Sequence, residues 1–79
     1  PYITMDKREA LKNGALLTSP GELNYVFTTA IQDYIRNKGL SYQTINDVAG
    51  AFECCKAEFY RRVAEPYEDG KIKENGDVY

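Results

Sequence analysis

The 79-residue sequence contains no histidine and no tryptophan, and its only two cysteines, Cys54 and Cys55, are adjacent. Without histidine, the usual general base near neutral pH is missing. Adjacent residues of a helix point about 100° apart, which excludes a disulfide between the two thiols. No histidine and no spaced cysteine pair is available to hold a structural metal. We therefore expect neither an enzyme nor a bound cofactor or metal.

Long apolar runs and clustered charge are also missing. No run approaches the ~20 apolar residues that a transmembrane helix needs, and no signal peptide opens the chain. The net charge of −2 is spread along the sequence, which predicts no attraction to nucleic acid or membranes. Free thiols, and a Pro1 of the kind exposed when an initiator methionine is removed, predict a cytoplasmic protein.

What the sequence does contain is helix signals. A chain of this length forms one domain, residues 1–79, with a modest core. Thr4 can cap a short surface helix over residues 5–13. The segment Ser19-Pro20-Gly21-Glu22 is a capping box with proline in the first helical position, and it predicts a helix over residues 20–38. Gly39 is the natural stop of that helix.

A third helix is predicted over residues 42–65. It begins near Ser41 or near Thr44, and it ends before Pro66 because the residue preceding a proline disfavours helical backbone. For the remaining residues, 66–79, we expect a largely irregular tail. Two alternatives stay open there: a small terminal β-hairpin turning at Asn75-Gly76, or a short helix that runs from Pro66 to Gly76.

Both long helices carry an apolar stripe with steps of three and four residues. In the second helix the stripe comprises Leu23, Val26, Phe27, Ala30, Ile31, Tyr34 and Ile35, and the polar half comprises Tyr25, Thr29, Gln32, Asp33 and Arg36. In the third it comprises Ile45, Val48, Phe52, Cys55, Phe59 and Val63, with Cys55 as a small core residue. We expect an all-α fold in which the two long helices form an antiparallel hairpin.

The two stripes hold more apolar surface than one hairpin can bury, which predicts a homodimer or a higher oligomer. Hairpins would pair into a four-helix arrangement, with Phe52 and Phe59 as interface candidates. A row of small residues, Gly50, Cys54 and Ala57, lies opposite the stripe of the third helix. This row is either a solvated face, or a place where the first helix or a second subunit approaches closely. Gly50 favours close approach, because glycine costs a helix about 1 kcal/mol relative to alanine.

The end of the third helix gathers aromatic and basic residues: Tyr60, Arg61, Arg62 and Tyr67. Such a set could stack a base and clamp a phosphate, which would suit a nucleotide. The alternative is that both arginines form ion pairs with Glu58, since their spacing from it suits helical pairs. DNA binding is not favoured, because the exposed flank of this helix mixes acidic residues with its few cations.

Four segments carry a resemblance to known proteins: residues 19–25 (SPGELNY), 39–48 (GLSYQTINDV), 65–69 (EPYED) and 74–79 (ENGDVY). Together they resemble a family of small uncharacterised proteins from bacteria and their phages. The resemblance implies a stand-alone cytosolic protein, and it carries over no activity and no functional residue. The leading hypothesis is a non-catalytic helical protein that interacts with itself or with another, unidentified protein. The alternative is a small-ligand (nucleotide) binding protein.

Overall fold

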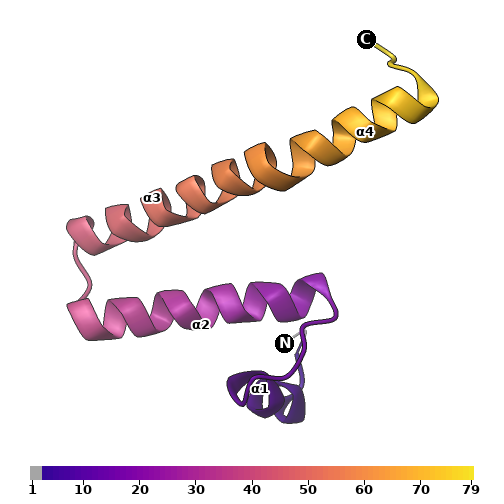
Figure 1. Ribbon diagram of the computed structural model, residues 1–79. Helices are drawn as coiled ribbons and strands as arrows, with labels where there is room; N and C mark the ends of the chain where they lie inside the picture. Colours follow the sequence, from indigo (N-terminus) through magenta and orange to yellow (C-terminus); the bar gives the residue numbers. More distant parts are fainter. Residues whose placement is uncertain (1–2) are drawn as a thin grey trace. The chain divides into compact units, whose positions relative to one another are not determined.

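The computed structural model describes residues 3–79 and is helical throughout, with no strand over those residues (Figure 1). The elements are α1 (Met5–Lys12), α2 (Pro20–Lys38), α3 (Tyr42–Phe59), a π-helical turn η1 (Tyr60–Ala64) and α4 (Glu65–Asn75). The expected all-α class is confirmed. Within the described part, no helix is both long and apolar enough to cross a bilayer. The interpretation of Pro1 lies outside the described residues.

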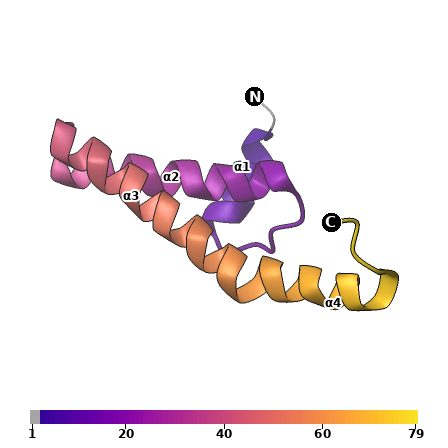
Figure 2. The ribbon, with the colours of Figure 1, turned by 90° about the horizontal axis from the view of Figure 1, so that it is seen from above.

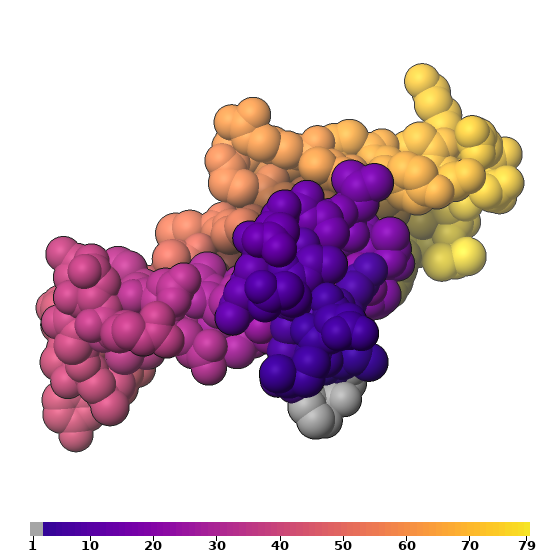
Figure 3. Space-filling view, turned by 90° about the horizontal axis from the view of Figure 1, so that it is seen from below, coloured from indigo at the N-terminus to yellow at the C-terminus, as the bar shows by residue number. Residues whose placement is uncertain are grey.

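The chain divides into two compact units, residues 1–44 and residues 45–79. We call these the N-terminal and C-terminal units; the prediction of a single domain stays a prediction. In the N-terminal unit α1 packs against α2, with Ile3 and Leu11 as buried apolar side chains. Figure 3 shows the indigo atoms of α1 against the violet start of α2. In the C-terminal unit no side chain is buried.

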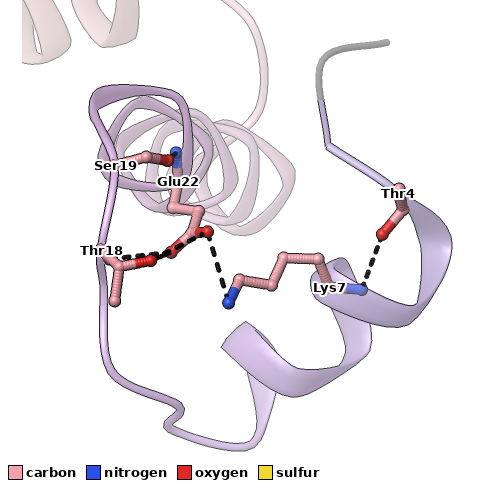
Figure 4. A network of polar contacts seen from close by, with 5 residues as sticks. All are labelled: Thr4, Lys7, Thr18, Ser19 and Glu22. Atoms are coloured by element: carbon pink, nitrogen blue, oxygen red, sulfur yellow. Dashed lines mark hydrogen bonds and ion pairs between the residues drawn. The ribbon is translucent and has the colours of Figure 1, made fainter.

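A network of polar contacts joins α1 to the start of α2 (Figure 4). Thr4 caps α1 by accepting a 3.2 Å hydrogen bond from the amide of Lys7. Ser19 caps α2 in the same way, accepting from the amide of Glu22 at 3.2 Å. The carboxylate of Glu22 reaches back to accept from the Thr18 amide at 2.8 Å and lies 3.3 Å from Lys7 Nζ. The predicted capping box is therefore present, and its glutamate also ties the two helices together.

On the side of α2 that carries Glu22, the observed burial differs from the burial expected from the sequence. Tyr25 and Thr29, assigned to the polar half of the helix, are half-buried. Both lie within two turns of Glu22 and on its side of the helix, and Glu22 is bound to α1 through Lys7. Their partial burial thus continues the side of α2 on which Glu22 contacts α1.

The turn between α2 and α3 is held by the Thr44 hydroxyl. Gly39 has a positive φ of 88°, and its amide donates to Ile35 O at 2.7 Å to end α2. Ser41 accepts from the amide of Thr44 at 3.1 Å, while Thr44 Oγ1 accepts from the amide of Ser41 at 2.9 Å and donates to Gly39 O at 2.9 Å. The cap of α3 is therefore Ser41, and a start at Thr44 is wrong, because Thr44 is its reciprocal partner one turn inside.

The largest difference from the sequence prediction is at Pro66, where the helix continues instead of ending. Figure 2 shows residues 45–75 as one uninterrupted helical run. At η1 the amide of Glu65 donates to Tyr60 O, five residues back. This wider turn moves the preceding carbonyls away from the proline ring, which would clash with them in a regular α-helix. Pro66 then lies at the start of α4, where its missing N–H is tolerated.

The expected irregular tail is therefore wrong over most of its length. Helix α4 extends to Asn75, and the Gly76 amide ends it by donating to Ile72 O at 2.8 Å. Of the two alternatives, the short helix from Pro66 to Gly76 is confirmed, and the terminal β-hairpin is wrong. A hairpin would have needed apolar flanks to bury, which these charged residues lack.

The network at Glu22 makes stability depend on pH. The Thr18 amide, and then Lys7, hold the pKa of Glu22 below its ordinary value of 4.5 against the opposing effect of desolvation. A lowered folded-state pKa contributes stability that is fully present above the ordinary pKa and is lost as pH falls through the folded-state pKa. We expect Glu22→Gln to melt lower than the natural protein near neutral pH, and the gap to close in acid.

Thermal melts from about pH 7 to about pH 3 test this expectation. Glu58→Gln is the matched control, since Glu58 is also an ion-paired carboxylate with a lowered pKa but lies on an exposed helix surface. Salt screens exposed pairs, so added salt should shrink the Glu58 effect more than the Glu22 effect. Equal, fully salt-sensitive effects at both positions would contradict the role of the Thr18 amide.

Candidate functional site

The first candidate surface is the apolar stripe of the C-terminal unit, defined as Ile45, Val48, Phe52, Cys55, Phe59 and Val63. About half of the surface of Ile45 (51%), Phe59 (54%) and Val63 (54%) is exposed. Cys55, expected in the core, is exposed and free. The expectation of a core position was wrong because a single helical run has no other element of its own unit to cover its apolar side.

The π-helical turn extends this stripe toward α4. Tyr67 follows Phe59 by eight residues, which would place it about 80° off the line of Phe59 in a regular α-helix. A turn closed by i→i+5 hydrogen bonds takes up one extra residue, so it removes roughly that angle. Tyr67, which is exposed, is thereby brought into line with Phe59. A signal in the sequence could have predicted this continuation: Pro66 follows directly on an unbroken helical pattern of apolar residues.

The second candidate surface is the row of small residues Gly50, Cys54 and Ala57. All are exposed, and they lie on the side of α3 opposite the apolar stripe. Nothing lies within 4 Å of the position that a Cβ on Gly50 would take. The space beside Gly50 is therefore open.

The third candidate is the cluster at the end of α3. Arg61 Nη2 lies 2.8 Å from Glu58 Oε2, and Arg62 Nε lies 3.0 Å from the same oxygen. These hydrogen bonds, that of Arg61 first, hold the pKa of Glu58 below its ordinary range. The ion-pair interpretation of both arginines is confirmed. One carboxylate between two guanidinium groups leaves the group with one net positive charge.

The two tyrosines of this cluster make separate contacts. The Tyr60 ring lies edge-on to Phe59, with centroids 5.9 Å apart and an interplanar angle of 81°. Lys71 Nζ lies over the Tyr67 ring, 5.5 Å from its centroid. Tyr60, Arg61 and Arg62 are consecutive, so their Cα–Cβ bonds fan out around the helix. The geometry joins the arginines through Glu58 and does not bring the two rings together.

The described residues contain no group of three or more histidine, cysteine, aspartate or glutamate side chains that could hold a metal ion. What the arrangement offers is contact surface: an apolar stripe along α3, aromatic rings at its end and a small net positive charge beside them. Aromatic and arginine side chains are the types that most often dominate binding energy at protein interfaces. The C-terminal unit therefore exposes side-chain types that are common at protein interfaces.

Comparison with known proteins gives a family and no activity. No curated protein matches the chain, and no solved structure matches it. A family model described as Domain of unknown function (DUF6899) matches residues 1–78. The match extends over both units and includes all the helices from α1 to α4. The chain belongs to this family, and its function is unknown.

Proposed function

We propose that this protein is a non-catalytic helical interaction protein that associates with itself through the apolar stripe of α3 and η1. The observation that carries the proposal is the half-exposure of Ile45, Phe59 and Val63 in a unit that buries none of its side chains. Most helical stability in proteins comes from packing an amphipathic face, and an isolated helix is marginal in water. A second copy supplies the missing face.

Within each copy, we propose that α2 and α3 form an antiparallel hairpin, and that two hairpins pair into a four-helix arrangement. Only Gly39, Leu40 and Ser41 connect the two helices, a loop length typical of αα-hairpins. The Ser41–Thr44 cap and the Thr44–Gly39 hydrogen bond hold this connection. We place the protein in the cytoplasm, because its free, exposed thiols suit a reducing compartment.

Multi-angle light scattering and thermal melts of the full chain over a range of concentrations test self-association. We expect a mass of two or more copies at micromolar concentration. We also expect a melting temperature that rises with protein concentration, because association stabilises the folded state by mass action. A monomeric mass together with a melting temperature independent of concentration would contradict the proposal.

A second function, binding of a nucleotide or a similar anion, would use the cluster of Tyr60, Arg61, Arg62 and Tyr67. The net positive charge of the two arginines with Glu58 and the exposure of both tyrosines support it. A thermal-shift screen of mononucleotides and cyclic nucleotides tests this function. We expect Glu58→Gln to strengthen binding by freeing both guanidinium groups, and the double change Arg61→Ala, Arg62→Ala to abolish it. Unchanged binding in the double variant would exclude the cluster.

A further inference from the structure

We propose that two copies pair with their α3 helices antiparallel along the apolar stripe, so that Ile45 of one copy lies against Val63 of the other. This inference rests on the proposed self-association and adds the face that is used and the direction of pairing. Its basis is that the stripe is self-complementary when read in opposite directions, about a centre near Cys54.

The layers of such a pair follow from residue spacing. Val48 then faces Phe59 of the second copy, and Phe52 faces Cys55. Ile45 faces Val63 in the same register only because the π-helical turn η1 takes up one extra residue after Phe59. The inner layers each place a large side chain against a small one, and the outer layer pairs two β-branched side chains of similar size. Facing positions that alternate large and small residues interdigitate at native packing density. The stripe therefore fits an antiparallel copy of itself without a void.

A parallel pair in the same register packs less evenly. It would place Phe52 on Phe52 and Phe59 on Phe59, with a Cys55 layer between them. Two bulky layers would hold the helices apart where two thiols cannot fill the space, and a gap in a core costs both contacts and transfer free energy. The uneven size of successive side-chain layers therefore disfavours parallel pairing.

Charges beside the stripe support the same direction. Lys56 lies at the margin of the stripe, and neither it nor Glu53 forms an ion pair within residues 3–79, although their i,i+3 spacing would allow one. Antiparallel pairing brings Lys56 of one copy beside Ala49 and Glu53 of the other, and symmetry repeats the contact. Each ammonium group then gains a carboxylate, and no like charges meet across the stripe.

Site-directed cross-linking tests the direction. In full chains that carry Cys54→Ser and Cys55→Ser, the changes Ile45→Cys and Val63→Cys are made separately. A short bis-maleimide should give no covalent dimer with either variant alone and a covalent dimer when the two are mixed. Covalent dimers from each variant alone would indicate parallel pairing and overturn the inference, as would a lack of cross-linking in every sample that remains dimeric.

Light scattering on the same variants separates the two proposals. A monomeric mass for the natural chain would overturn both the self-association and its direction. A dimeric mass with the wrong cross-linking pattern would overturn the direction alone. Should the engineered cysteines disturb folding, the natural thiols identify the face. Cys54→Ser should keep a bis-maleimide dimer and Cys55→Ser should lose it, and the reverse result would place the interface on the row of small residues.

Discussion

Replacing Phe59 by lysine is expected to convert the associated protein into monomers at micromolar concentration. The Phe59 side chain lies in an inner layer of the proposed antiparallel contact, opposite Val48 of the second copy, and the substitution acts twice in a symmetric pair. Losing one well-buried phenylalanine costs about 3–5 kcal/mol, and each 1.4 kcal/mol is roughly tenfold in affinity. We therefore expect self-association to weaken by at least about 100-fold, measured by sedimentation equilibrium or by light scattering on dilution.

The matched control is Ala57→Lys, which introduces the same charge within one turn of Phe59 but on the row of small residues. Alanine and lysine are both good helix formers, and Ala57 is exposed, so we expect this variant to keep the mass of the natural protein. If Ala57→Lys dissociated the protein and Phe59→Lys did not, the interface would lie on the opposite face of α3 and the assignment of the apolar stripe would be wrong.

Replacing Gly39 by alanine is expected to destabilise the protein by about 1–3 kcal/mol. Gly39 ends α2 with φ 88° and ψ 148°, a region of backbone conformation that is essentially restricted to glycine. No atom lies within 4 Å of the added Cβ, so the cost is one of backbone conformation and not of a clash with neighbours. The measurement is the midpoint of urea unfolding at a fixed protein concentration, with the slope compared between variants.

Gly50→Ala provides the opposite expectation with the same chemical change. Gly50 lies inside α3 with open space around it, and alanine at such a position is more favourable than glycine by about 0.5–1 kcal/mol. We therefore expect a higher midpoint than that of the natural protein, with an unchanged mass. A loss of stability or of association in Gly50→Ala would indicate that another backbone packs against the row of small residues.

Sequence signals predicted a helix boundary correctly where the interaction that sets it lies within one helical turn. The Ser19 cap and Gly39 gave α2 its observed bounds, because a cap satisfies orphan amides a few residues away and a positive φ needs glycine at one position. The periodic pattern of α3 predicted the apolar stripe for the same reason. At Pro66 the local rule was wrong, because a wider turn in the preceding residues relieved the clash on which the rule depends.

The bounds of α2, the start of α3 and the apolar stripes of both helices followed from the sequence alone, whereas the continuation of the helix through Pro66 did not. Only the tertiary structure decided which faces are covered: α1 packs on α2 and contacts it at Glu22, while the stripe from Ile45 to Val63 stays half open. Coverage depends on contacts between segments distant in sequence, whose free energy no short pattern encodes. Helix caps and apolar periodicity depend on residues that are close together in the sequence, so the sequence predicts them.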